Sequence, residues 1–127
     1  MKKKISILVL LLIVFASCQQ EEKKAEKIAY AYLNAMANYR VNEAEMYATP
    51  ETSKTTLVLS KQLLAMVDTA YIISDTPAKI DIQELVIQDD TLATVKYVKN
   101  TPLKQNMQGE LLLVKRGKQW LAHDELN

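Results

Sequence analysis

The sequence predicts an α+β fold in which N-terminal helices pack on a curved four-stranded antiparallel sheet. Apolar residues recur at steps of three and four before Thr76, whereas they alternate with polar residues after Pro77. Helices and strands in separate runs along the chain are typical of α+β architectures. The length of 127 residues, of which 49% are hydrophobic and 24% charged, fits one globular domain.

The first helix of the domain is predicted over residues 25–40. Steps of three and four place its apolar residues on one face: Ile28, Ala29, Tyr32, Met36 and Tyr39. The segment 38–42 is expected to end this helix, and residues 43–47 are expected to form a short second helical turn.

A third helix is expected to begin at Thr49 and Pro50. Thr49 can cap free backbone N–H groups, and Pro50 suits a first helical position because proline has no N–H to leave unpaired. A broad apolar face then follows, formed by Leu57, Leu59, Leu63, Leu64, Met66, Val67 and Tyr71. This pattern predicts the longest and most buried helix of the domain.

The strands are predicted from alternation. Ile80 and Ile82 alternate with polar residues, and Leu85 and Ile87 continue in the opposite phase, which predicts a β-bulge near Glu84. Three further strands are expected at about 93–98, 110–115 and 119–126. Asp89-Asp90 and Arg116-Gly117 are the predicted turns of this meander.

The first eighteen residues have the pattern of a secretion signal. A basic start precedes an apolar run over 5–16, which is shorter than the roughly 20 residues of a membrane-spanning helix. Phe15-Ala16-Ser17 directly before Cys18 resembles the lipobox of bacterial lipoproteins, and this resemblance implies that Cys18 carries lipid. The alternative is an uncleaved anchor with an inert Cys18. The expected organisation is a signal peptide over 1–17, a lipidated cysteine with a polar tether over 18–24, and a domain over 25–127.

The polar segment after Cys18 bears on localisation. Residues 19–24 contain no apolar side chain, and their acids resemble the export signal of Bacteroidota lipoproteins. The resemblance implies attachment to the outer membrane of the cell envelope and leaves the periplasmic and surface-exposed faces both open.

Composition excludes several classes of function. Without residues 1–17 the chain has 13 basic and 15 acidic residues, a net charge of −2, so no nucleic-acid partner is expected. One cysteine excludes an internal disulfide, and one histidine excludes most zinc sites. Only two glycines are present, which argues against a phosphate-binding glycine loop. No cofactor or metal is expected.

Five segments of the domain resemble the nuclear transport factor 2-like, or cystatin-like, superfamily, and in particular its uncharacterised Bacteroidota lipoproteins. They are residues 30–36, 38–44, 47–51, 91–95 and 113–120, the last placing Trp120 at the start of the closing strand. The resemblance implies an α+β cone, in which helices cover one face of a curved sheet. It also implies a possible homodimer through the exposed sheet face, where Thr94, Lys96 and Val98 are expected.

Some enzymes of this superfamily are isomerases or dehydratases with Asp or His inside the cone. The residues to consider here are Asp68, Asp81, Asp124 and His123. Asp68 is expected to be solvated near a helix end, and Asp81 to point away from the buried face. His123 and Asp124 are strand neighbours and therefore face opposite sides. Asp89-Asp90 with Glu84 is conceivable as a metal site, but acids in a hairpin are usually turn formers. We therefore expect no enzyme.

Aromatic residues supply the candidate pocket, which comprises Tyr32, Met36, Tyr39, Tyr97 and Trp120. These side chains are expected either to fill the cone as core or to line a ligand pocket between helices and sheet. The sequence thus predicts a lipid-anchored extracytoplasmic binding or interaction module of unknown partner that is not an enzyme. The alternatives are a small-molecule binding protein that uses the aromatic-lined cone, or an isomerase- or dehydratase-like enzyme.

Overall fold

The computed structural model describes the backbone of residues 2–124 and the side chains of residues 19–124. The helical part comes first: α1 (Lys2–Ala37), α2 (Val41–Ala44), the 3₁₀ turn η1 (Glu45–Tyr47), α3 (Pro50–Lys54), α4 (Thr56–Met66) and α5 (Thr69–Ser74). The strands follow as β1 (Lys79–Asp89), β2 (Leu92–Asn100), β3 (Met107–Arg116) and β4 (Gln119–His123). They form one antiparallel four-stranded sheet in the order β1-β2-β3-β4. The predicted α+β architecture is confirmed.

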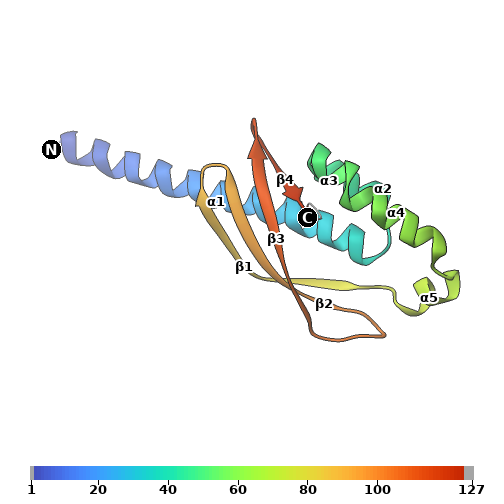
Figure 1. The fold of residues 1–127 in the computed structure, drawn as a ribbon. Helices are drawn as coiled ribbons and strands as arrows, with labels where there is room; N and C mark the ends of the chain where they lie inside the picture. The colour runs from blue at the N-terminus through green and yellow to red at the C-terminus, as the bar shows by residue number, and fades with distance from the viewer. Residues whose placement is uncertain (1, 125–127) are drawn as a thin grey trace.

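The sheet curves across α1, and the short helices lie at the C-terminal end of α1 (Figure 1). The face of α1 that meets the sheet contains the fully buried Ala25, Ala29 and Ala35. Because alanine is small, the helix backbone can approach the strands closely, and Tyr32 and Leu33 fill the remaining space. The apolar face predicted for this helix is the buried one.

Both ends of α1 differ from the prediction. Residues 19–24, expected as a solvated tether, continue the helix. At the other end α1 stops at Ala37, three residues before the predicted end, because Tyr39 has a positive φ of 64° and the Arg40 N–H donates to the Ala35 carbonyl at 2.8 Å.

The predicted start at Thr49 is confirmed. The Thr49 hydroxyl accepts a hydrogen bond from the Thr52 N–H, and Pro50 occupies the first helical position of α3. The Thr49 N–H donates to the Ala122 carbonyl at 2.9 Å, so this helix start is fixed to the end of β4.

The prediction of one long and most buried third helix is wrong. Non-helical dihedrals at Thr55 and Val67 divide the segment into α3, α4 and α5. Among the residues of α4 only Thr56 and Leu57 are buried. The physical reason is that α1 already covers the inner face of the sheet, so α4 packs on α2 and α3 with one side and leaves the other side in solvent.

The β-bulge is confirmed. The register of β1 against β2 shifts between Ile82 and Glu84, so that Ile80 and Ile82 before the shift and Leu85 after it all pack against the core. Strand β3 begins at Met107, earlier than predicted, and β4 runs to His123, while the predicted strand end near Leu126 lies outside the described residues.

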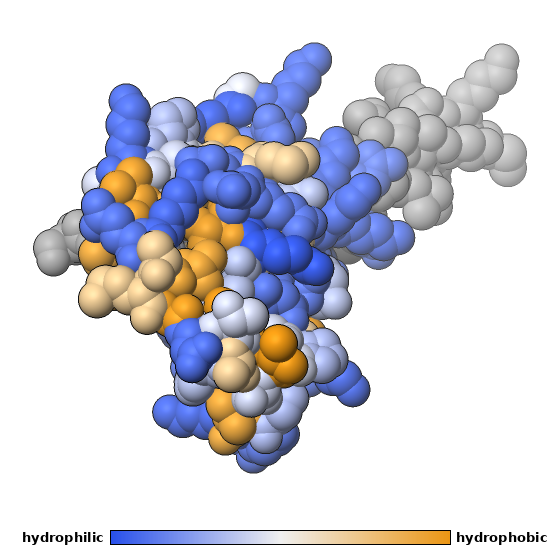
Figure 2. All heavy atoms as spheres, turned by 90° about the vertical axis from the view of Figure 1, so that its right-hand side faces the viewer, coloured by the Kyte–Doolittle hydropathy of each residue, from blue (hydrophilic) through white to orange (hydrophobic). Residues whose placement is uncertain are grey.

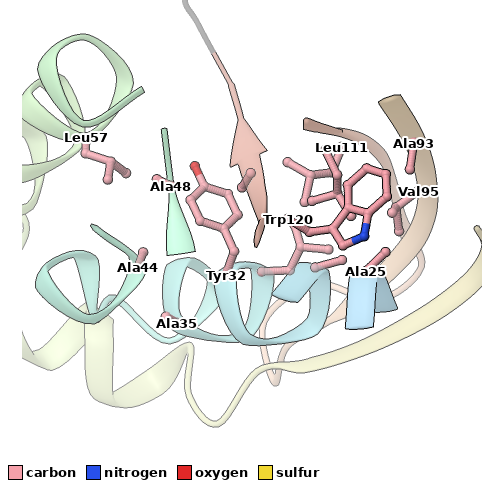
Figure 3. Packing of buried hydrophobic residues seen from close by; sticks show 14 of the residues in the cluster. Ala25, Tyr32, Ala35, Ala44, Ala48, Leu57, Ala93, Val95, Leu111 and Trp120 are labelled. Atoms are coloured by element: carbon pink, nitrogen blue, oxygen red, sulfur yellow. The ribbon is translucent and has the colours of Figure 1, made fainter. Parts of the chain in front are cut away.

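The core lies between α1 and the concave sheet face, and Figure 3 shows Tyr32 standing on α1 and Trp120 lying against Val95 and Leu111. Its strand residues are Ala93, Val95, Leu111, Leu113, Trp120 and Ala122, and its residues from the short helices include Val41, Ala44 and Leu57.

Candidate functional site

The five residues of the candidate pocket occupy three different environments. Tyr32 and Trp120 are each 2% exposed and belong to the core, and Met36 packs against that core. Tyr39 lies just after the end of α1, and Tyr97 lies on β2. The structure therefore places Tyr32 and Trp120 together in the core cluster, whereas Tyr39 belongs to a separate polar contact.

Trp120 is hydrogen-bonded to Glu21, which lies within α1. Its indole N–H donates to Glu21 Oε2 at 2.9 Å, and Lys115 Nζ bonds the same oxygen at 2.8 Å. Lys115 Nζ also lies 5.8 Å from the centre of the Trp120 ring. Lys115 first, and Trp120 second, lower the pKa of Glu21. The sequence placed Glu21 in a tether, because nothing local signals a contact with a residue 99 positions away.

Tyr32 carries the one unpaired buried polar atom found among the described side chains. Its Oη has no partner at ordinary hydrogen-bond distance, although the ring stands inside the core. Burial first, then the negative charge of Asp124, and third a longer contact between the hydroxyl and that carboxylate raise the pKa of Tyr32. A buried hydroxyl without a partner is unfavourable, so this atom marks the position where a water or a ligand group would be stabilised.

Tyr97 lies over a glycine of the neighbouring strand. It pairs with Gly109, and a Cβ added at Gly109 would stand 2.5 Å from Cζ and Oη of Tyr97. The absence of a side chain at Gly109 thus leaves room for the ring. Burial first, and Asp124 second, raise the pKa of Tyr97. A shallow hollow of about 440 Å³ lies at the same place, where Lys96, Val98, Gln108 and Glu110 are further lining residues.

Tyr39 forms a hydrogen bond with the buried carboxylate of Asp75, a residue that the sequence did not indicate as part of a site. Its hydroxyl donates to Asp75 Oδ2 at 2.6 Å, and Asp75 is a buried residue at the end of α5. The pKa of Asp75 is lowered, mainly by a hydrogen bond from the Thr101 hydroxyl and next by the one from Tyr39. The pKa of Tyr39 is raised, mainly by burial and next by its hydrogen bond to Asp75. Close by, the Asn38 side chain accepts from the Ala78 N–H at 2.8 Å. The Tyr39–Asp75 and Asn38–Ala78 hydrogen bonds connect the segment between α5 and β1 to the end of α1.

A second hollow, of about 560 Å³, lies on the other side of Tyr39, between the α1–α2 turn and α4. Val41 and Leu64 provide apolar lining, and Arg40 and Lys61 provide charged lining. Arg40 pairs with Glu43 at 2.9 Å and Lys61 with Glu45 at 2.9 Å, so both cations already have carboxylate partners.

His123 takes part in a hydrogen-bond network at the end of β4. Its Nδ1 lies 2.9 Å from Thr49 Oγ1, which in turn lies 2.8 Å from Thr52 Oγ1. The Asp124 N–H donates to Thr52 Oγ1 at 2.9 Å, and the Thr56 hydroxyl donates to the Asp124 carbonyl. These contacts join the end of β4 to α3 and α4. Thr49 and Thr52 are fully buried, so the centre of the network is shielded from solvent.

The other acids considered from the sequence have local contacts. Asp68 caps α5 by accepting from the Ala70 N–H at 3.0 Å, and exposed Asp81 accepts from Gln83 at 2.7 Å. Asp89 accepts from the Thr91 N–H at 2.7 Å, a contact that lowers its pKa and is typical of a turn former. Within residues described by the structure, no group of three or more His, Cys, Asp or Glu side chains is arranged to hold a metal ion.

The outer sheet face is mixed in character. Thr94, Lys96 and Val98 alternate with the inward Val95 and Tyr97 along β2. Lys96 lies 3.8 Å from Glu84 on β1, and the exposed Val86 and Leu112 lie on either side of Thr94 in the register. The face therefore offers an apolar part and a charged part side by side.

The predicted lipidation at Cys18 and the signal peptide over 1–17 lie outside the residues whose side chains are described. In the part of the chain that the structure describes, no helix combines the length and apolar character needed to cross a membrane.

Comparison with solved structures identifies the fold. A nuclear transport factor 2-like transpeptidase, so named, from Campylobacter jejuni superposes with a TM-score of 0.60 at 15% identity, covering 79% of this chain and 97% of that one. A ketosteroid isomerase-like protein from Erwinia carotovora atroseptica superposes with a TM-score of 0.52 at 15% identity, covering 81% and 92%. No protein-family model and no curated protein sequence matches the chain. The domain thus has the nuclear transport factor 2-like fold, which hosts many functions.

Proposed function

We propose that this protein is a lipid-anchored interaction module of the bacterial cell envelope that is attached to the outer membrane through Cys18 and is not an enzyme. In this proposal the nuclear transport factor 2-like domain binds another envelope protein through its outer sheet face. The periplasmic and surface-exposed sides of the membrane are both compatible with this role.

One observation carries the proposal: the chain's own side chains occupy the space between α1 and the sheet, while large apolar side chains lie on the outside. Tyr32, Trp120 and Leu113 are at most 2% exposed, whereas Val86 and Leu112 are exposed on the outer sheet face. Large apolar groups that remain in water favour binding of a partner. The only imidazole, His123, is engaged with the cap of α3, which supports a structural role for it.

The sheet face can be tested by photocrosslinking in the full-length lipoprotein within its membrane. A photoreactive phenylalanine at Val86 should give a discrete adduct with a second protein, and Leu112→Lys should abolish it by placing a charge in the apolar part of the face. The same probe at exposed Leu103, in the loop before β3, is the matched control. Equal adducts at both positions, or none at Val86, would contradict binding through the sheet.

The anchor has its own test. Cys18→Ala should leave the precursor uncleaved by the lipoprotein signal peptidase and without lipid, because the acyl chains are attached to that sulfur. Mass spectrometry of the membrane fraction measures both properties. A variant that is still acylated and retained like the wild type would refute the proposed anchoring.

Small-molecule binding is the second candidate function, and the unpaired Oη of Tyr32 favours it. A polar ligand group that reached this atom would satisfy the buried hydroxyl and lie near the Asp124 carboxylate. Tyr32→Phe should then lose ligand binding while the domain stays folded. If the atom has no ligand, the same substitution changes stability alone.

A further inference from the structure

The outward side of α4 carries a stripe of large apolar residues beside the exposed Gln62. Leu59, Leu63 and Met66 follow at steps of four and three, which places them on one stripe of the helix. Figure 2 views the side of the molecule on which α4 and α5 lie, and apolar side chains gather there. Six large apolar side chains on these two helices are between 42 and 82% exposed. They are called the α4–α5 face and comprise Val58, Leu59, Leu63, Met66, Tyr71 and Ile73.

We propose that the α4–α5 face is the interface between two copies of this chain, with α4 packed against α4 of the second copy. This inference goes beyond the proposed function, because it uses none of the residues of the outer sheet face. A dimer of this kind leaves both sheet faces available to a partner.

The spacing of the stripe suits a two-fold axis. If two α4 helices run antiparallel, an axis between Gln62 and Leu63 brings Leu59 opposite Met66 of the other chain and leaves Leu63 within one residue of its own copy. Leucine and methionine are similar in volume, so the stripe is complementary to itself, as an interface between identical subunits requires.

The charge of the helix also suits self-association. A two-fold axis brings each charge near its own copy, so a charged stripe would repel itself. The sole charged residue of α4 is Lys61, and its Nζ is paired with Glu45 at 2.9 Å. The stripe itself contains no charge.

The apolar area is of the size that a stable dimer needs. Tyr71 and Ile73 are two residues apart on α5 and face different sides, so one of them at a time can join the stripe of α4. With about 150–200 Å² for one fully exposed large side chain, the stripe and one α5 residue together expose on the order of 350–500 Å². A stable interface buries about 800 Å² on each partner, of which somewhat more than half is apolar. The α4–α5 face therefore supplies most of the apolar part of such an interface, and polar side chains at its edge would complete it.

Disulfide trapping tests the proposal in the full-length protein within its own membrane. Leu63→Cys introduces a thiol next to the expected axis, and Cys18 is the one cysteine of the natural chain. Mild oxidation with copper phenanthroline should convert most of the Leu63→Cys protein to a disulfide-linked homodimer, seen on a non-reducing gel. Adding Leu59→Lys should reduce the dimer to background, because it places two charges in the seam.

Three controls make the result decisive. The wild type, oxidised in parallel, gives the background due to Cys18. Leu103→Cys is as exposed as Leu63→Cys and reports random collision, and Leu112→Cys reports pairing through the sheet face. Trapping at Leu112 instead of Leu63, equal trapping at all three positions, no trapping at Leu63, or an adduct at Leu63 whose mass is that of a different protein would each overturn the proposal.

Discussion

The two apolar helices of this domain, α1 and α4, have opposite relations to its core. The buried face of α1 is largely alanine, with Ala25, Ala29 and Ala35 fully buried, whereas α4 is rich in leucine and leaves Leu63 and Met66 mostly in solvent. The difference follows from position. The curved sheet has one concave face, α1 occupies it, and small residues allow the closest approach. Hydrophobicity alone therefore does not tell which helix is buried.

Trp120→Ala is the change with the largest expected effect on the α1 side. It removes a large buried ring and leaves Glu21 without its indole donor, so the free energy of unfolding should fall by about 3–5 kcal/mol. Urea denaturation followed by circular dichroism measures this. Trp120→Phe, which keeps most of the ring volume, should lose clearly less; equal losses would mean that packing against α1 is not what Trp120 contributes.

A matched pair on α4 tests the comparison within one helix. Leu57 is fully buried and Leu63 is 53% exposed. Leu57→Ala should therefore cost about 2–4 kcal/mol of unfolding free energy through the cavity it leaves, and Leu63→Ala at most about 0.5 kcal/mol in the monomer. Denaturation at low protein concentration, where a dimer dissociates, is the appropriate measurement. Similar costs at the two positions would show that α4 buries both sides.

Asp75→Asn tests whether the ionised carboxylate of Asp75 stabilises the end of α1. The folded-state pKa of Asp75 is lowered, so its contribution is present at neutral pH and is lost as the pH falls from about 4 through the folded value. At pH 7 the variant should lose about 1–2 kcal/mol, since hydrogen bonds to a charged group are replaced by neutral ones. Urea midpoints of both proteins between pH 7 and pH 3 should converge. A constant difference over this range would rule out the ionised carboxylate as the cause.

Tyr32→Phe has the smallest expected effect, and its sign is informative. Because Tyr32 Oη lacks a partner, its removal should leave stability unchanged or raise it by up to about 1 kcal/mol. Thermal unfolding of the protein taken from its own membrane measures this. A clear loss of stability would show that the hydroxyl has a partner in the folded protein, and a loss that persists in Asp124→Ala would identify that partner as a water or a ligand rather than the Asp124 carboxylate.

Local signals predicted most of the fold. The alternation of Ile80 and Ile82 with a phase change before Leu85 located the β-bulge, and Thr49-Pro50 located a helix start, because both features depend on neighbouring residues. The leucine pattern around α4 led to a wrong prediction of its burial, because burial depends on which helix packs on the concave face of the sheet. Contacts across the chain, such as Glu21 with Trp120 and Tyr39 with Asp75, leave no local pattern and were missed. The candidate pocket was predicted only as a set of aromatics, of which Tyr32 and Trp120 lie in the core.

Native mass spectrometry of the lipoprotein, gently extracted from its own membrane, tests the central claim that function lies on the outer surfaces. We expect an acylated protein that is present as a homodimer, or bound to a second protein, with no small molecule on each protomer. A bare monomer, or a protomer that retains a stoichiometric small molecule which Tyr32→Phe releases, would contradict it and assign the function to the interior between α1 and the sheet.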